Sequence, residues 1–446
     1  MAILKVGYAR VDITPTEPVP LAGYGNTDKR ISNNILSHLY CTCIAFTGED
    51  GNTVLLFHND LINSPTVLST PARESISAAT GVPFEQIIIA ATHTHSAPDV
   101  WQEKFESIQN FRKYFTEQAT KCAVEAMADR KSAELSVAKT KTRNLNFVRH
   151  YLMNDGSVVG DNYGTTAGKT YVGHVTQADP EMRLVKFTRE GGEDILLVNW
   201  QTHPHRTGGN KKYDISADIV GAMRDEVEAA TGMRFIYFTG GAGNINPHSR
   251  IKEENIAPDF LAQGKAMAEY AIAALPTLQN VAAGPVRFAH RYQREPLNRP
   301  SEELLENAKK IQALWLELND ASEVNKVGQP LGIHSPYHAN ALIAKYNLPE
   351  DTQVEIPLNA FSIGDVAFAT TPYETFDTNA REVREGSPFP MTVFSSCANN
   401  TTSYIPSAAG FAIGGYEADC TRALPGTGEK MANILVDMLT ELHKKA

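Results

Sequence analysis

The stretch Ile87-Ile-Ile-Ala-Ala-Thr-His93-Thr-His95-Ser-Ala-Pro-Asp99 decides the fold of this chain. Its first five residues are apolar and rich in β-branched side chains, a pattern typical of a strand that is buried on both faces. Such a strand predicts helices on both sides of its sheet, because each face must be covered. The two histidines follow the strand directly, and side chains at positions i and i+2 of an extended chain lie on the same face.

Short apolar runs alternate with longer helical periods on both sides of this stretch. The expected strands are Thr53–Phe57, Gln86–Ala91, Ile195–Trp200, Phe235–Thr239, Phe361–Thr370 and Thr392–Ser395. The expected helices are Pro71–Ala79, Gln109–Asp129, Ala217–Thr231, Asp259–Leu275, Ser301–Leu318 and Gly428–Lys444. Alternating strands and helices predict an α/β architecture of layered sheets flanked by helices. No Pro-, Gly- and Ser-rich linker divides the chain, so residues 1–446 are expected to form one domain, with the more polar region 285–350 as an insertion or lid.

Composition limits the classes of partner and the compartment. The net charge of −10 over 446 residues argues against nucleic acid, which needs a basic surface. No apolar run reaches the roughly 20 residues of a membrane-spanning helix, and the N-terminus does not read as a secretory signal, so we expect a cytoplasmic protein. Five scattered cysteines without a CxxC motif predict reduced thiols, with Cys41 and Cys43 on one face of a strand.

Histidine pairs follow two of the expected strands. Taken alone, His93 and His95 fit a metal site or a loop with two incidental histidines. The strand Ile195–Trp200 is followed by a second pair, His203-Pro-His205, and this repetition favours the metal site. Zn²⁺ binds neutral imidazole, and ligands of open α/β sheets bind at the carboxyl ends of the strands.

Three weaker signals also follow expected strands. The glycines of Gly240-Gly-Ala-Gly243-Asn-Ile-Asn246 allow a close approach to a ligand and offer N–H groups to an oxyanion, but they equally fit a tight turn. Glu374 fits either a ligand or an acidic residue at the start of a helix. Tyr404 and Tyr416 lie in Gly- and Asn-rich loops, where surface tyrosines are the alternative.

Taken in order, these segments resemble the catalytic domain of the neutral, non-lysosomal ceramidase family and its shorter bacterial relatives. The order and spacing of the motifs carry the resemblance, which covers nearly the whole chain. The matching segments are Val6-Gly-Tyr-Ala-Arg-Val-Asp12-Ile-Thr-Pro15, Leu21-Ala-Gly-Tyr-Gly25, Thr92-His-Thr-His-Ser96, Asp179-Pro-Glu181, Asn199-Trp200 through His203, Gly243-Asn-Ile-Asn-Pro247, Gly364-Asp365 and Gly414-Gly-Tyr-Glu417.

The resemblance implies a site and a reaction. It implies one Zn²⁺ per chain, whose family ligands fall on His93, His203, Glu374 and Tyr404. The family's other active-site histidine, later tyrosine and arginine fall on His95, Tyr416 and Arg149. We expect hydrolysis of a linear amide by metal-activated water, with His95 as general acid and base and with Tyr416 and Arg149 stabilising the oxyanion or orienting the substrate. Gly243 and Asn246 are expected at the substrate or oxyanion side of the site.

Departures from the family pattern bear on the substrate. Family ceramidases carry Gly-Asp-Val-Ser-Pro where this chain has Gly243-Asn-Ile-Asn-Pro247, so Asn246 replaces the serine. The family's secretion signal and C-terminal immunoglobulin-like domain are not expected, which makes a small soluble amide a candidate beside an N-acyl lipid. Two alternatives stay open: an ester or lactone hydrolase that uses the same site, and a metal-stabilised binding protein without catalysis. The sequence does not decide the specificity, the oligomeric state, a second cation or the roles of His205 and His248.

Overall fold

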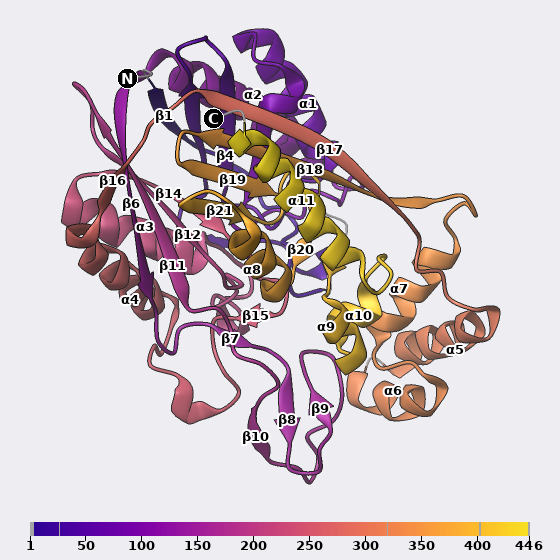
Figure 1. The fold of residues 1–446 in the computed structure, drawn as a ribbon. Helices are drawn as coiled ribbons and strands as arrows, with labels where there is room; N and C mark the ends of the chain where they lie inside the picture. The colour runs from indigo at the N-terminus through magenta and orange to yellow at the C-terminus, as the bar shows by residue number, and fades with distance from the viewer. Residues whose placement is uncertain (1–3, 26, 319, 401–402, 445–446) are drawn as a thin grey trace.

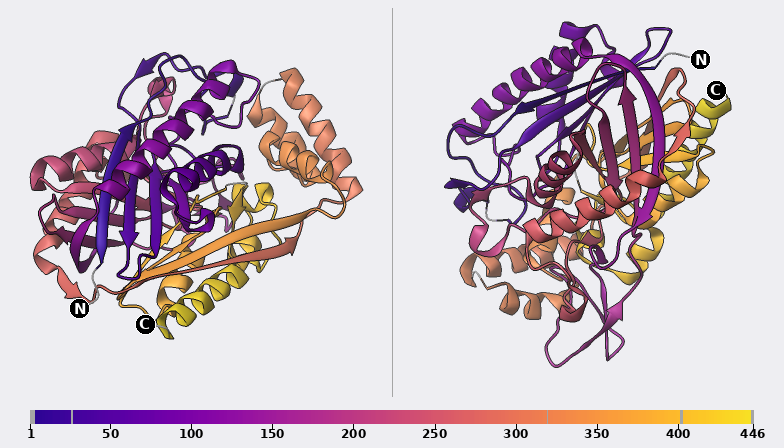
Figure 2. Two further views of the ribbon diagram at one scale, coloured as in Figure 1. Left: turned by 90° about the horizontal axis from the view of Figure 1, so that it is seen from above. Right: turned by 90° about the vertical axis from the view of Figure 1, so that its left-hand side faces the viewer.

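The computed structural model describes residues 4–25, 27–318, 320–400 and 403–444, which form two sheets stacked face to face with helices outside both (Figures 1 and 2). The larger sheet has, among these residues, the order β14 (Arg234–Thr239), β12 (Ile195–Trp200), β11 (Glu181–Arg189), β6 (Lys131–Lys141), β1 (Lys5–Asp12), β3 (Tyr40–Thr47), β4 (Thr53–Asn59) and β5 (Ile87–Ala91), with β16 (Gln279–Val281) beside β6. The smaller sheet has the order β17 (Val286–Pro296), β18 (Gln353–Ile363), β19 (Val366–Thr370) and β21 (Met391–Ser395).

The helices cover the outer face of each sheet. The helices α1 (Thr66–Thr80), α2 (Glu106–Ala128), α3 (Asp218–Thr231) and α4 (Phe260–Ala274) pack on the larger sheet, and α8 (Asp377–Gly386) and α11 (Thr427–Lys444) pack on the smaller one. Between the sheets, Phe46 of β3 packs against Phe361 and Phe368, with ring centroids 5.8 and 5.6 Å away. The predicted fold class, layered sheets flanked by helices, is confirmed.

Short elements complete the site face of the molecule. They are β2 (Asn34–Ile35) paired with β13 (Asp214–Ile215), β7 (Phe147–Val148) with β15 (Ile245–Asn246), β20 (Glu374–Thr375) with β22 (Tyr404–Ile405), the helices α9 (Ala408–Ile413) and α10 (Tyr416–Cys420), and the sheet of β8 (Tyr151–Met153), β9 (Val158–Val159) and β10 (Tyr171–His174). Single 3-10 turns lie at Thr27–Lys29, Phe84–Gln86, Gly209–Lys211, Lys252–Glu254, Leu275–Thr277 and Gln329–Leu331. Figure 1 shows the β8–β10 sheet projecting at the lower end of the molecule.

The region expected as an insertion or lid divides into two parts. Its first residues form β17, a full member of the smaller sheet that pairs with β18 along its whole length. The helices α5 (Glu302–Leu318), α6 (Ala321–Gly328) and α7 (Pro336–Tyr346) then pack around a small apolar core of their own. Figure 1 shows these three helices grouped at one side of the molecule, beside α10.

Two sequence expectations need correction. The expected strand Phe361–Thr370 is the end of β18 and all of β19, because Gly364, at a φ of 74°, and Asp365 make a hairpin turn inside it. The first helix begins at Thr66 rather than at Pro71, so the proline lies inside α1.

Cys41 and Cys43 lie on one face of β3 as predicted, and both are free thiols. In the described part of the chain, no helix combines the length and hydropathy needed to cross a bilayer.

Candidate metal centre and active site

The carboxyl ends of strands from both sheets meet at one place. Ser396, after β21, donates its N–H to the carbonyl of Thr239 at the end of β14, 3.0 Å away. Ala90 of β5 forms a β-bridge with Ala398, so the loops after β5, β14 and β21 are held together. His203, three residues beyond β12, donates its N–H to Ile245, which lies in the loop after β14. This junction gathers the two histidine pairs that are far apart in the sequence.

Three donor atoms meet at the bottom of this junction. The Oε2 atom of Glu374 lies 3.2 Å from Nε2 of His93 and 3.1 Å from Nε2 of His203. The side chains are 14%, 4% and 1% exposed, respectively. Tetrahedral Zn²⁺ ligands with bonds of about 2.0–2.1 Å are about 3.3 Å apart, so this spacing suits a shared cation.

The tautomers of His93 and His203 also favour a shared cation. The Nδ1–H of His93 donates to the carbonyl of Ile62 at 2.6 Å, and the Nδ1–H of His203 donates to Ile245 at 3.0 Å. In a neutral ring the Nε2 atom then carries a lone pair, which here faces a carboxylate oxygen. The buried Nε2 of His93 has no hydrogen-bond partner among the described residues. Two imidazole nitrogens and a carboxylate oxygen fit Zn²⁺. The ion would replace the repulsion between their lone pairs with three metal–ligand bonds.

The charges around Glu374 are unevenly distributed. Burial opposes a charge on His93, but the neighbouring Glu374 carboxylate raises the pKa of that ring well above its ordinary value. Burial, together with the nearby Arg149, lowers the pKa of His203 to about 3. A positive charge beside the carboxylate is therefore favoured, and either a proton on His93 or a bound cation can supply it.

Tyr404 reaches this junction through backbone pairing. β20 and β22 run parallel, and Glu374 lies directly opposite Tyr404 in their register. Burial, and next the Glu374 carboxylate, raise the pKa of Tyr404 well above its usual range, so the phenol is neutral unless a cation binds it. Its ring packs edge-on against Tyr416, 5.7 Å away between centroids.

His95 lies beside the other two histidines, although not for the expected reason. His93 has a φ of 72°, so the chain is not extended there, and the prediction that spacing along a strand puts both rings on one face is wrong. The rings of His93 and His203 are nevertheless 5.1 and 5.5 Å from that of His95. Neither ring nitrogen of His95 has a hydrogen-bond partner among the described residues. Burial and the positive charge on His93 lower the pKa of His95 well below its ordinary value.

The residues expected to hold the substrate divide into two groups. Arg149 and Asn246 line the cavity, and Arg149 is held there by hydrogen bonds to Glu417 and to the carbonyl of Gly243. The N–H of Gly243 donates to the carbonyl of Thr375 at 2.9 Å, and the expected oxyanion role of this glycine stays a prediction. Gly243 also has a packing role, because a Cβ there would lie 2.4 Å from the carbonyl oxygen of Glu374.

Sequence reasoning missed several residues that support this site. A Cβ on Gly23, at a φ of 106°, would lie 2.5 Å from the His95 side chain, and the Tyr24 ring packs edge-on against His95. Glu417 is buried and binds both Arg149 and His150. In the sequence, these residues were marked only by the Leu21-Ala-Gly-Tyr-Gly25 and Gly414-Gly-Tyr-Glu417 motifs. Those motifs did not indicate what each side chain does.

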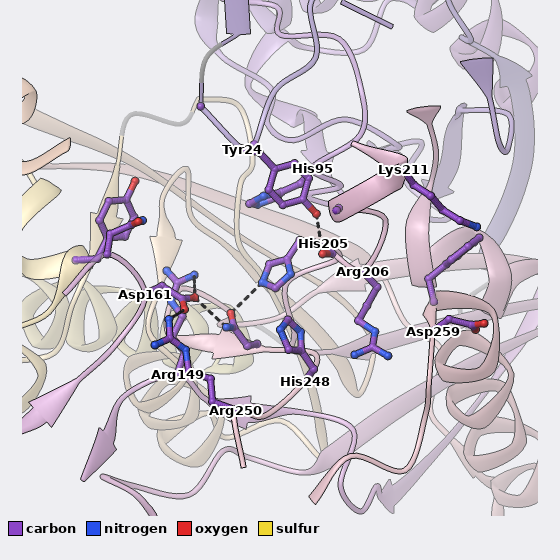
Figure 3. A pocket seen from close by; sticks show the side chains of 18 of the residues that line it. Tyr24, His95, Arg149, Asp161, His205, Arg206, Lys211, His248, Arg250 and Asp259 are labelled. Carbon is purple, nitrogen blue, oxygen red and sulfur yellow. Dashed lines mark hydrogen bonds and ion pairs between the residues drawn. The ribbon is translucent and has the colours of Figure 1, made fainter. Parts of the chain in front are cut away.

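A cavity of about 750 Å³ opens above the histidines (Figure 3). Its lining includes His95, Arg149, Asn246, Tyr404 and Tyr416, and in addition Tyr24, Asp161, His205, Arg206, Lys211, His248, Arg250, Asp259, Phe260 and Tyr337. The two histidines that the sequence left undecided are therefore cavity residues. His205 Nε2 contacts Asn246 Oδ1 at 3.0 Å, and His248 packs edge-on against His205.

A second cluster of His334, His338 and Asp419 joins α7 to α10. His334 Nδ1 lies 2.9 Å from a carboxylate oxygen of Asp419, and His338 Nδ1 accepts the N–H of His334 at 3.3 Å. These contacts satisfy the groups locally at the start of α7, and they explain the cluster without a metal.

Comparisons with known proteins identify the fold. No protein-family model matches the chain, and no curated protein matches it. The solved structure of neutral ceramidase from Pseudomonas aeruginosa matches all of this chain and 75% of its own, with a TM-score of 0.74 and 18% identity. A structure described as ceramidase complexed with C2 matches all of this chain and 76% of its own, with a TM-score of 0.73 and 17% identity. The resemblance expected from the sequence is confirmed at the level of structure: the chain has the fold of neutral ceramidase.

Proposed function

We propose that this protein is a zinc-dependent hydrolase that cleaves a linear amide bond. The observation that carries the proposal is the position of Glu374 Oε2, which lies 3.2 Å from His93 Nε2 and 3.1 Å from His203 Nε2, below a wide cavity. Two imidazole nitrogens and a carboxylate oxygen at this spacing form more favourable contacts with a shared Zn²⁺ than with one another. The solved structures with this fold are described as ceramidases, which supports an amide as the substrate.

The chain's own residues supply the remaining parts of the reaction. His93, His203, Glu374 and Tyr404 would hold the ion, which when bound lowers the pKa of water to about 7 and polarises the substrate carbonyl. Neither ring nitrogen of His95 has a hydrogen-bond partner in the described part of the chain, and the proposed role of His95 is to take a proton from the attacking water and to pass it to the leaving nitrogen.

Charge that develops on the carbonyl oxygen needs donors that are already in position. The Arg149 guanidinium lines the cavity and is held by the buried carboxylate of Glu417, so it does not have to reorganise during the reaction. Tyr416 also lines the cavity, and its hydroxyl is the proposed second donor for that oxygen. Asn246 is engaged by Asp161 and His205, and its proposed part is to keep these side chains in place.

Zinc content and amide hydrolysis test the proposal together. We expect one zinc per chain by elemental analysis, hydrolysis of members of a panel of linear amides, loss of activity with a chelator and recovery with added zinc. His203→Ala should lose both metal and activity. His290→Ala is the matched control, since that histidine contacts Asn359 on the smaller sheet and should leave both unchanged. Full zinc occupancy in a His93→Ala/His203→Ala double variant would contradict the ligand assignment.

A further inference from the structure

We propose that Arg206, Lys211 and His248 form a subsite for an anionic group of the substrate, so that the preferred amides carry a carboxylate. This inference rests on the proposed amide hydrolysis. Figure 3 shows Arg206 and Lys211 on one side of the cavity and Arg149 and Asp161 on the other, with His95 and His205 between them. Arg206 is three residues from His203, so their backbones are at most about 11 Å apart. One small substrate can therefore reach both the metal cluster and this subsite.

The charge of the cavity differs from that of the whole chain. The chain carries −10, yet four cationic side chains and two carboxylates line the cavity. Arg149 is paired with Glu417, and Arg250 is paired with Asp161 at 2.7 Å. Among the described residues, Arg206 and Lys211 form no ion pair: Arg206 donates to the carbonyl of Ala257 at 2.8 Å, and the Lys211 ammonium lies 5.1 Å from the centroid of the Phe260 ring.

No nearby carboxylate pairs directly with these two cations in the described part of the chain: Asp218 and Asp259 act on the Arg206 charge only from a distance, and their direct contacts lie elsewhere. Asp161 accepts hydrogen bonds from Asn246 and Arg250. Asp259 accepts the N–H of Ala262 at 2.9 Å and so caps the start of α4. Asp218 is fully buried and accepts from Thr207 and from the N–H of Ile219. Arg206 keeps donors free to bind a planar oxyanion through two parallel hydrogen bonds.

His248 places a neutral imidazole ring beside Arg206. The buried Nδ1 of His248 has no hydrogen-bond partner among the described residues, and Figure 3 shows the ring next to the Arg206 side chain. Two unpaired cations and an unsatisfied imidazole on one wall together favour an anion over a neutral polar group.

Matched substrates test the inference. N-butanoylglycine carries a carboxylate on the amine side, the N-ethyl monoamide of succinic acid carries it on the acyl side, and N-butanoylglycinamide is a neutral analogue of the first. With the zinc-loaded wild type we expect kcat/KM for one of the two carboxylates to exceed that for the neutral amide by about tenfold or more. A phosphate analogue, N-butanoyl-O-phosphoethanolamine, shows whether any oxyanion suffices.

Variants separate this subsite from the metal. Arg206→Gln and Lys211→Gln should bring the ratio close to one and leave turnover of the neutral amide within about threefold, and Arg206→Lys should restore part of the preference. Lys265→Gln, on α4 and outside the cavity lining, is the control. Equal kcat/KM for neutral and anionic amides in the wild type would overturn the inference and leave amide hydrolysis standing. A preference for anionic amides that persists in Arg206→Gln would also overturn the inference, because the zinc ion alone would then explain the preference.

A binding measurement covers the case in which no amide is hydrolysed, which would contradict the proposed function. Calorimetry should still show N-butanoylglycine binding the wild type about tenfold more tightly than N-butanoylglycinamide does, and this difference should disappear in Arg206→Gln. Equal affinities of the wild type for the two compounds would overturn the subsite independently of any reaction.

Discussion

At the scale of single residues, the three central histidines differ in what their ring nitrogens contact. His93 and His203 each donate from Nδ1 to a backbone carbonyl, which turns Nε2 toward Glu374. His95 makes no such contact with any residue that the structure describes, and it packs against Gly23 and Tyr24. The His-x-His spacing predicted that these histidines belong together, but it could not separate ligand from proton carrier. That distinction depends on carbonyl groups of Ile62 and Ile245, which no pattern of side chains reveals.

The first residue-scale prediction concerns His95. We expect His95→Ala to keep its zinc and to lower kcat by at least about 10²-fold, the usual size of a general acid/base contribution. Zinc content by elemental analysis and turnover of one amide are measured on the same sample. If the variant lost its zinc, His95 would be a ligand, which remains a geometric option because its ligand atom lies within 4.8 Å of those of His93 and His203.

At the scale of elements, the apolar strands were predictable and their neighbours were less so. β4, β5, β12, β14 and β21 match the expected strands within two residues at each end, because uniform burial gives uniformly apolar runs. β6 was not predicted, since its alternate side chains are partly exposed and polar. The pairing of β20 with β22 could not be predicted either. Each strand has two residues, and only the packing of distant segments sets Glu374 opposite Tyr404.

The element-scale prediction concerns the ion pairs that join α10 to the chain between β7 and β8. Burial alone would raise the pKa of Glu417, but Arg149 and His150 lower it to about 2. An unfolded glutamate has a pKa of about 4.3, so this carboxylate contributes about 3 kcal/mol of stability above that pH. The contribution is lost as the pH falls toward 2. We therefore expect Glu417→Gln to be less stable than wild type at pH 7, and the difference to shrink steadily below pH 4.5.

Urea unfolding at a series of pH values measures this difference. Glu441→Gln is the control, because Glu441 pairs with Arg291 at 2.6 Å on the surface, where an ion pair contributes about 0–1 kcal/mol. A stability difference between wild type and Glu417→Gln that stays constant from pH 7 to pH 3 would contradict the assignment of the charge to Glu417.

At the scale of the whole molecule, the site draws on residues from Gly23 to Glu417. Two stacked sheets make this possible, because the segments that follow strands of both sheets meet at one junction. The order of motifs along the chain was enough to predict that His93, His203 and Glu374 come together. The charge of the cavity wall was not predictable, because Arg206 and Arg250 look alike in the sequence and only one of them is neutralised in the fold.

The last prediction concerns the size of the substrate and follows from the whole cavity. A long-chain ceramide carries two hydrocarbon chains, which need an extended apolar surface. The cavity of about 750 Å³ is lined instead by arginines, histidines, carboxylates and amide groups, and its apolar contacts come mainly from Phe260, Pro258 and the tyrosine rings. Burying Arg206 and Lys211, which form no ion pair among the described residues, against hydrocarbon would leave their charges without partners. We therefore expect short-chain amides to have a higher kcat/KM than long-chain ceramide, measured side by side in detergent-free buffer with the zinc-loaded protein. Turnover of long-chain ceramide at least as fast as that of every short amide tested would contradict this expectation and would make ceramide itself the better assignment.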